Sequence, residues 1–276
     1  MAPDLKDYYK YLVGSSKPFL ISGPCVIENK DHSLYLATKI KEITDRLGIE
    51  YIFKASFDKA NRTKLDNFRG LKNIEESLNV FRAIKEKLGL KVCTDFHEAD
   101  QAAMIADVVD IIQIPAFLCR QTDLLVSAAK TGNIVNVKKG QFISGLDTDR
   151  ITSKIKDSGN ELIFLTERGN TFGYNDYVVD FRNIPIMKNF SPVIFDVGHS
   201  LQKGCSGGSS GSHMQFAEPL LKAALAIGVD GIFMEVHDDP KNALSDGSTS
   251  VKLSELEELL KRNEYLWLKR KVDQIN

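Results

Sequence analysis

Residues 18–27 read PFLISGPCVI, and this stretch sets the pattern from which the fold can be predicted. It is strongly apolar, it shows no regular apolar–polar alternation, and it contains glycine where the apolar run stops. Strands that are buried on both faces, as in a parallel sheet, have this appearance. Seven further runs of the same kind follow at near-regular spacing, over 51–57, 91–96, 110–117, 133–140, 161–169, 192–200 and 230–238.

Amphipathic stretches with helical spacing separate these runs, and several of them stop at a glycine, the usual helix C-terminal signal. They include 33–48, 77–89, 123–132 and 218–228. Eight strands that alternate with helices, with no Pro/Gly-rich linker, predict an α/β fold of the (β/α)8 TIM-barrel type. A doubly wound sheet is the weaker alternative, because it would carry G-x-G-x-x-G after its first strand, where this chain has SGPCVIE.

The length of 276 residues is compatible with two domains of ~150 residues or with one α/β barrel of about 250. The strand count favours the barrel. We therefore expect residues 1–276 to form a single barrel domain, in which 1–17 are a short N-terminal extension placed to close the barrel bottom.

The composition is that of an ordinary globular chain, with 43% hydrophobic and 26% charged residues, which excludes disordered, collagen-like and coiled-coil classes. The 36 Lys and Arg balance 37 Asp and Glu, so we expect no nucleic-acid and no membrane partner. No apolar run approaches the ~18 residues of a spanning helix, and the charged N-terminus lacks a signal-peptide core. The four cysteines show no disulfide-framework spacing. These features predict a cytoplasmic protein with reduced cysteines.

In a barrel the active site lies at the C-terminal ends of the strands, and here almost every expected strand ends in a chemically capable residue. In chain order they are Cys25, Lys54, Asp95 with His97, Gln113, Lys138, Arg168, His199, and Glu235 with His237. Cations gather at or just past these ends: Lys54, Lys59, Arg62, Arg120, Lys138 and Arg168. Any one of them could belong to a solvated basic rim. As a set in a near-neutral chain they predict a site for several phosphates or carboxylates.

A second subset has the chemistry of metal ligands. It comprises Cys25, His199, Glu235 and, in the loop after the last strand, Asp246. The first, seventh and eighth strands become neighbours once the barrel closes, so these residues can converge on one ion. Thiolate, imidazole and carboxylate together favour one divalent ion such as Zn, Fe or Mn over Mg or Ca. No two of the four share a local spacing such as C-x-x-C, and a buried, unliganded Cys25 is the alternative.

Other residues have more than one interpretation. His97, beside Asp95, is placed to bind a phosphate, to move a proton, or to make a structural hydrogen bond. Pro115 breaks the fourth strand and is expected to present Ala116 and Phe117 as an apolar wall. The low-complexity stretch 202–215, QKGCSGGSSGSHMQ, predicts a mobile loop. No role is expected for His32 and His213, and His237 is equally well explained as a surface residue.

Taken together, these motifs make the chain resemble the KDO8P synthase family (3-deoxy-D-manno-octulosonate 8-phosphate synthase, or 2-dehydro-3-deoxyphosphooctonate aldolase). The matching segments span from about Gly23 to beyond Leu260, and long unusual strings among them make the match specific. They are SGPCVIE (22–28), FKASFDKANRT (53–63), TDFHE (94–98), IIQIPAFLCRQTDLL (111–125), VKKGQF (137–142), TERGNTFGYND (167–176), FDVGHSLQ (195–202) and GVDGIFMEVHDDPKNALSDG (228–247).

The resemblance implies an aldol-type transferase. Phosphoenolpyruvate (PEP) condenses with D-arabinose 5-phosphate and water, inorganic phosphate leaves, and the product serves lipopolysaccharide (KDO) synthesis. The residues implied at PEP are Lys54, Ser56, Lys59, Gln113, Ala116, Lys138 and Arg168. Those implied at arabinose 5-phosphate are Asn61, Arg62, Thr63, Asp95, Phe117 and Gln202. The residues implied in catalysis are Lys59, His97, Lys138, His199 and Asp246. A homotetramer is also implied, because the arginine of the family's ANR[ST] stretch reaches a sugar phosphate in a neighbouring subunit.

The resemblance also bears on the metal. The family divides into metal-dependent and metal-independent classes, and an Asn at the position of Cys25 marks the metal-independent class. The motif here is Gly-Pro-Cys, and Asp246 stands in Ala-Leu-Ser-Asp-Gly. Both resemble the metal-dependent class, with Cys25, His199, Glu235 and Asp246 as ligands and no organic cofactor.

One segment departs from the family pattern. After HSLQ the family has Pro-Gly-Gly, then Ser-Gly-Gly and an Arg, whereas this chain has KGCSGGSSGSHMQ with Met214 in place of that Arg. We therefore do not expect the family's loop-closing and sugar-side contacts to carry over unchanged.

Three alternative functions remain on the sequence alone. The first is 3-deoxy-D-arabino-heptulosonate 7-phosphate synthase, which takes erythrose 4-phosphate and carries Lys-Pro-Arg-Thr where this chain reads Lys-Ala-Asn-Arg-Thr at 59–63. The second is a Schiff-base aldolase that uses Lys54 or Lys138. The third is a catalytically silent barrel that binds a phosphosugar or stores a metal.

Overall fold

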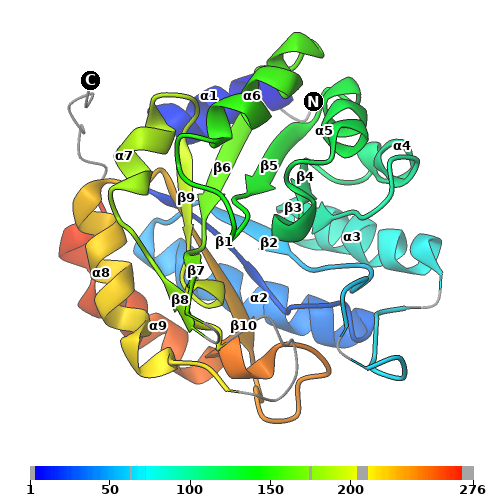
Figure 1. Cartoon of the computed structure of the whole chain (residues 1–276). Helices are drawn as coiled ribbons and strands as arrows, with labels where there is room; N and C mark the ends of the chain where they lie inside the picture. Colours follow the sequence, from blue (N-terminus) through cyan, green and yellow to red (C-terminus); the bar gives the residue numbers. More distant parts are fainter. Residues whose placement is uncertain (1–3, 63, 72, 174–175, 204–210, 269–276) are drawn as a thin grey trace.

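The computed structural model describes residues 4–62, 64–71, 73–173, 176–203 and 211–268. Within them, eight parallel strands pair in sequence order, and the first also pairs with the last, with Phe19 opposite Gly231 (Figure 1). The strands are β1 (Phe19–Gly23), β2 (Tyr51–Lys54), β3 (Lys91–Asp95), β4 (Ile111–Ile114), β5 (Ile134–Lys138), β6 (Ile163–Glu167), β9 (Val193–Asp196) and β10 (Gly231–His237). The predicted (β/α)8 barrel is therefore confirmed.

Helices follow the strands and pack their apolar faces on the outside of the barrel (Figure 1). They are α2 (Lys30–Leu47), α3 (Ile74–Leu88), α4 (Gln101–Ala106), α5 (Thr122–Lys130), α6 (Thr148–Asp157), α7 (Asn183–Lys188), α8 (Ala217–Ile227) and α9 (Leu253–Arg262). Glycine ends α2 and α8 as predicted, because Gly48 (φ 59°) and Gly228 (φ 95°) adopt the left-handed conformation that closes a helix C-terminus.

The first helix, α1 (Leu5–Gly14), lies against the N-terminal end of the barrel. Its Tyr8 and Leu12 belong to the apolar cluster that fills the barrel interior, together with Phe19 and Phe164. The Tyr9 hydroxyl donates a hydrogen bond of 2.8 Å to the carbonyl of Ile163, the first residue of β6. Residues 5–14 therefore pack at the end of the barrel away from the strand C-termini. That residues 1–276 form one domain stays a prediction.

Several short elements gave no sequence signal, since none has room for an apolar period. They are β7 (Asn170–Phe172), β8 (Asp176–Val178), β11 (Val251–Lys252), η1 (Ala116–Leu118), η2 (His199–Leu201), η3 (Met214–Phe216), η4 (Gly247–Thr249) and η5 (Glu264–Leu266). β7 and β8 pair in an antiparallel hairpin after β6. Most of these elements belong to the loops at the C-terminal ends of the strands, where a barrel carries its functional side chains.

Among the described helices, none combines the length and the apolarity that crossing a membrane requires.

Candidate active site

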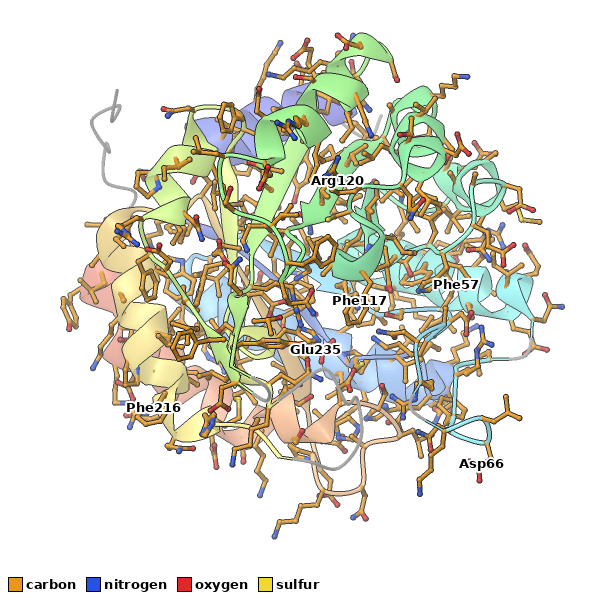
Figure 2. The ribbon with its side chains drawn as sticks, in the orientation of Figure 1. Phe57, Asp66, Phe117, Arg120, Phe216 and Glu235 are labelled. Atoms are coloured by element: carbon orange, nitrogen blue, oxygen red, sulfur yellow. The ribbon has the colours of Figure 1, made fainter. Side chains whose placement is uncertain are left out.

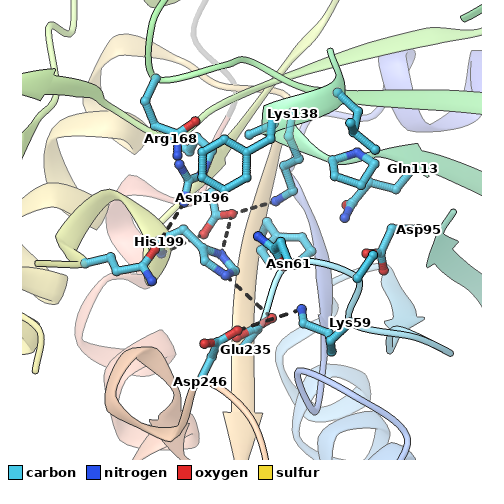
Figure 3. A pocket seen from close by; sticks show the side chains of 18 of the residues that line it. Lys59, Asn61, Asp95, Gln113, Lys138, Arg168, Asp196, His199, Glu235 and Asp246 are labelled. Atoms are coloured by element: carbon cyan, nitrogen blue, oxygen red, sulfur yellow. Dashed lines mark hydrogen bonds and ion pairs between the residues drawn. The ribbon is translucent and has the colours of Figure 1, made fainter. Parts of the chain in front are cut away.

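A cavity of about 280 Å³ opens at the C-terminal end of the barrel (Figure 3). Fifteen of the predicted site residues line it: Lys54, Lys59, Asn61, Arg62, Asp95, His97, Gln113, Ala116, Phe117, Lys138, Arg168, His199, Gln202, Glu235 and Asp246. Cys25 and Ser56 lie behind this lining, with Cys25 Sγ 3.0 Å from Asp246 Oδ2 and Ser56 Oγ 3.0 Å from Lys54 Nζ. Thr63 is outside the described residues.

Two of the predicted residues, Arg120 and Phe117, are not part of the cavity interior. In Figure 2, Glu235 is among the central side chains, whereas Asp66 and Phe216 are at the periphery. Arg120 does not line the cavity. Phe117 does line it but is 44% exposed, so it forms part of the rim rather than of the floor.

The cavity floor is built from buried cations and carboxylates. Lys54 Nζ lies 3.5 Å from Asp95 Oδ1, and Lys59 Nζ lies 3.8 Å from Asp246 Oδ2. Although burial opposes the charged form, Asp95 raises the pKa of Lys54, so this ammonium stays protonated. A buried Lys holds its charge only beside such partners, and the resulting array offers fixed positive charge to anions.

Arg168 is the cation best placed to take a new anion. Its Nη1 is buried and finds no hydrogen-bond acceptor within the described part of the chain, while Nη2 reaches Gln202 Oε1 at 3.4 Å. Its guanidinium stacks 5.3 Å from the ring centroid of Tyr177 in β8. A buried donor without an acceptor is costly, and an incoming carboxylate or phosphate would satisfy it.

Lys138, at the end of β5, is held differently. Its ammonium makes a 2.6 Å ion pair with Asp196 Oδ2 and lies 3.1 Å from the centroid of the Phe233 ring. Burial lowers the pKa of Lys138 to about 8, although Asp196 raises it in part. Lys138 is therefore the lysine of this cavity whose pKa is lowered toward neutral pH, whereas the pKa values of Lys54 and Lys59 are raised.

Asp196, the last residue of β9, was not predicted as a site residue. It accepts hydrogen bonds from Lys138 and from both the backbone N–H and Nδ1 of His199, at 3.1 and 2.9 Å for the latter two. These partners hold its pKa well below its usual range despite burial. With Nδ1 donating to Asp196, the His199 Nε2 lone pair faces Glu235 Oε1 at 3.8 Å, and the four residues form one row (Figure 3). The only sequence signal was an acid at a strand end.

Three of the four predicted metal ligands come together. One donor atom each from Cys25, Glu235 and Asp246 lies within 4.8 Å of the other two, and His199 borders the group through Glu235. Both carboxylate oxygens of Glu235 are buried without a hydrogen-bond donor among the described residues. A buried carboxylate in that condition is satisfied by a cation, and the mixed donor set fits a borderline divalent ion. These residues can therefore hold a metal ion.

Backbone geometry explains how Cys25 and Asp246 meet. A side chain at Gly23 would place its Cβ 2.2 Å from the Lys54 carbonyl oxygen, so glycine is required for the end of β1 to approach β2 this closely. Asp246 has a φ of 45°, the only positive φ of a non-glycine residue in the described ranges. Such strain is typical of residues whose position serves a function.

Burial raises the pKa of the Cys25 thiol well above its usual range, and the carboxylates of Asp246 and Glu235 add to the shift. The thiol therefore stays protonated beside these acids and donates to Asp246. A divalent ion at this position would reverse the balance, because a coordinating thiol loses its proton.

Arg62, which also lines the cavity, contacts the loop that carries Asp246. Its Nη1 donates to Ser245 Oγ at 2.6 Å and its Nη2 to the Leu244 carbonyl at 3.2 Å. His97 Nε2 lies 3.5 Å from Asp95 Oδ2, and its Nδ1 is buried without a partner in the described ranges. His97 therefore keeps one ring nitrogen available, in agreement with a role beyond packing.

The loop 202–215, whose sequence differs from the family pattern, is described only at its ends, because 204–210 lie outside the described residues. Met214 packs against the apolar core and does not line the cavity. His213 Nε2 lies 3.1 Å from Asp176 Oδ1 on β8. The residue that replaces the family's Arg therefore serves packing here.

Comparison with known proteins places these observations in a family. Residues 5–268 match the family described as the DAHP synthetase I family. The 2-dehydro-3-deoxyphosphooctonate aldolase of Cyanothece sp. (strain PCC 7425 / ATCC 29141) is 51% identical over 265 residues, which are 95% of this chain and 94% of that protein. The protein of the same name from Geobacter metallireducens is 53% identical over 253 residues, 91% of this chain and 93% of that one. The one from Brucella anthropi is 51% identical over 251 residues, 90% of each chain.

Proposed function

The chain belongs to the DAHP synthetase I family, among the 2-dehydro-3-deoxyphosphooctonate aldolases, and from this premise we propose that it condenses PEP with D-arabinose 5-phosphate. Water enters, 3-deoxy-D-manno-octulosonate 8-phosphate forms, and inorganic phosphate leaves. The observation that carries the proposal is the buried cationic floor with the unsatisfied Arg168 donor, because both substrates are phosphorylated anions. The product would enter lipopolysaccharide (KDO) biosynthesis in the cytoplasm.

We assign PEP to the deep half of the cavity. Arg168 Nη1 takes one anionic group in a charge-assisted hydrogen bond, and Lys138 supplies a second positive charge. The full set assigned to PEP is Lys54, Ser56, Lys59, Gln113, Ala116, Lys138 and Arg168. Arabinose 5-phosphate is assigned to Asn61, Arg62, Thr63, Asp95, Phe117 and Gln202, a set that runs from Asp95 on the floor to Phe117 on the rim.

The reaction joins C3 of PEP to the aldehyde carbon of the sugar. A C–C bond forms as the enol π pair attacks, the aldehyde oxygen takes a proton, water adds at C2, and the tetrahedral intermediate expels phosphate. Holding the two substrates in one orientation can lower the barrier by up to roughly 7–11 kcal/mol in ideal intramolecular cases. The fixed cations also offset the repulsion between two phosphates. Proton transfer is assigned to His97, His199 and Asp246, which line the cavity.

We further propose that Cys25, His199, Glu235 and Asp246 bind one divalent ion such as Zn, Fe or Mn, as in the metal-dependent class. The ion would polarise the water or the aldehyde oxygen. The support is the Cys25–Glu235–Asp246 cluster and the two unsatisfied oxygens of Glu235. A homotetramer completes the proposal. Its support is the position of Arg62 at the rim and the exposed Phe117, Phe142 and Phe172 in the same set of loops.

The choice of sugar is the first testable point. The Asn61 insertion lengthens the stretch that meets the sugar, which favours the five-carbon aldose over erythrose 4-phosphate. We expect kcat/KM for phosphate release from PEP to be at least ~100-fold higher with arabinose 5-phosphate, since unpaired polar groups in a site built for one more hydroxyl cost several kcal/mol. Equal rates with both sugars, or a preference for erythrose 4-phosphate, would assign the chain to the shorter-sugar synthases.

The second testable point is how kcat/KM for PEP changes with pH on the alkaline side. Lys138 binds an anion only as the ammonium form, and its pKa in the folded chain is about 8. We therefore expect kcat/KM for PEP to fall as pH rises through about 8. At higher pH the slope of the profile should reach that expected for the loss of a single proton. In Lys138→Arg, whose guanidinium stays charged, the residual activity should lack this limb. A limb that persists in that variant would show that another group titrates.

A further inference from the structure

A second cluster of metal-type ligands lies beyond the proposed active site, further along the same two strands. Glu28 follows β1, His32 is in the first turn of α2, and His237 ends β10. One donor atom from each of the three lies within 4.8 Å of the other two. None of the three lines the cavity, and the sequence had given His32 no role.

Local structure fixes His32 in place. Asn29 caps α2, and its side-chain oxygen accepts the His32 backbone N–H at 2.8 Å. The His32 Nε2 meets Asp238 Oδ1 at 2.8 Å, so Nε2–H donates to that carboxylate and Nδ1 carries a lone pair. That lone pair faces Glu28 Oε2, 3.8 Å away.

Two acceptors that face one another at this distance repel, and a positive charge between them removes the repulsion. His32 Nδ1 is buried and makes no hydrogen bond within the described ranges. The charge is either a proton on Nδ1 or a cation shared by the imidazole and the carboxylate. Burial also favours a shared ion, because the His237 side chain is only 7% exposed and those of Glu28 and His32 only about 15%.

The outer side of the cluster has the arrangement that supports histidine ligands. Asp238 Oδ1 lies 2.8 Å from His32 Nε2 and 3.2 Å from His237 Nδ1, so one carboxylate reaches the outer nitrogen of both rings. Metal-binding histidines are usually held by such a carboxylate. The inner atoms, His32 Nδ1 and His237 Nε2, then face Glu28, whose Oε1 lies 3.2 Å from His237 Nε2.

We propose that Glu28, His32 and His237 form a second divalent-metal site, separate from the Cys25 cluster and specific for the zinc class of ions. Two imidazoles and one carboxylate are a known zinc donor set, and imidazole disfavours Mg and Ca. Water would complete the coordination. The proposal does not depend on the reaction assigned to the cavity.

Metal binding at this site moves a proton. His237 Nδ1 now accepts the Asp239 N–H at 3.0 Å, which places the ring proton on Nε2. Coordination of an ion through His237 Nε2 removes that proton, and the neutral ring then carries its proton on Nδ1, where it can be donated to Asp238. The hydrogen bond from the Asp239 N–H to Nδ1 is lost and the contact with Asp238 replaces it. Ion binding therefore releases or relocates a proton.

The site is connected to the loop that carries Asp246. Glu28 Oε1 accepts the Leu244 N–H at 2.9 Å, two residues before Asp246. An ion on Glu28 therefore ties β1, α2 and β10 to this loop, as a structural ion does. It would steady Asp246, whose φ of 45° needs support from its surroundings.

Equilibrium dialysis of the full chain against buffered Zn²⁺ tests the proposal. We expect two Zn²⁺ per parent chain and one per chain in His32→Gln, with affinity for the second ion at least tenfold lower. The matched control is His213→Gln, which removes a histidine that pairs with Asp176 outside both clusters, and it should still bind two. One ion in the parent that His32→Gln retains, or two in His32→Gln at unchanged affinity, would overturn the proposal and leave a proton between His32 and Glu28.

Two measurements remain informative if a variant folds poorly. Of the two clusters, the one at Cys25 contains a thiol and the one at His32 does not, so a second equivalent of Co²⁺ that adds d–d absorption without a thiolate charge-transfer band marks the nitrogen–oxygen site. Anomalous diffraction from zinc-soaked parent crystals should give a peak between Glu28, His32 and His237. Absence of that peak at saturating zinc contradicts the proposal.

Discussion

Removing divalent metal with a chelator is expected to lower kcat by at least ~1,000-fold, and Zn, Fe or Mn should restore it. Metal activation of a water or carbonyl oxygen contributes several kcal/mol, and 1.36 kcal/mol corresponds to a tenfold rate change. The Glu235 oxygens have no donor among the described residues to replace the ion. The measurement is steady-state phosphate release before chelation, after it and after reconstitution, with metal content determined in each sample.

Two cysteine variants sharpen this prediction. Cys25→Asn removes the only thiol of the cluster, so its residual activity should no longer respond to chelator. Cys119→Ala is the control, because Cys119 is also a buried thiol, directly after η1, and takes no part in the cluster. It should respond as the parent does. Full activity in a parent sample verified to be metal-free would show that the Cys25 cluster is not a metal centre.

Asp196→Asn is expected to have the second-largest effect. Within the described residues, Asp196 is the carboxylate that pairs with Lys138, and it also orients His199. The amide of the variant carries no negative charge to orient His199. The affinity for a divalent ion bound by the Cys25 cluster and His199 should therefore fall 10- to 100-fold, as when other residues that hold a ligating histidine are changed. The free energy of unfolding should fall by about 3 kcal/mol, at the low end for a broken buried ion pair. Zinc titration and urea unfolding measure the two quantities.

The same variant makes a signed prediction about pH. Asp196 raises the pKa of Lys138, so its removal should lower that pKa below about 8 and move the alkaline fall in kcat/KM to lower pH. Asp230→Asn is the matched control. Asp230 is a buried acid 3.2 Å from Lys188, at the opposite end of the barrel, so this variant should lose stability but keep its metal affinity and pH profile. If both variants lose metal equally, Asp196 acts only through stability.

The elements of the fold that could be predicted are those whose structure leaves a signal in their own stretch of sequence. The strands were visible because both of their faces are buried, as in β5, where all five residues are inaccessible. Helix ends were visible where a glycine closes them, as at Gly48. The hairpin of β7 and β8 was not, because its six residues are mostly exposed and short, and with it Tyr177 was missed as the partner of Arg168.

Site residues followed the same division. Lys54, Lys138 and Glu235 lie at the ends of strands, so the barrel topology alone places them at the same end of the barrel, independent of loop conformation. Their presence in the site could therefore be predicted. Partnerships depend on tertiary register: Lys138 and Asp196 lie 58 residues apart on strands separated by β6. His32 and Asp238 are 206 residues apart, and nothing local in the sequence relates them.

One cavity joins the two phosphorylated substrates, and ³¹P NMR of PEP and arabinose 5-phosphate mixed with the metal-loaded protein follows both of them at once. We expect both substrate signals to decline together, while inorganic phosphate and one new phosphomonoester appear in equal amounts. Phosphate that forms while arabinose 5-phosphate remains unconsumed, or no phosphate at all, would contradict this expectation.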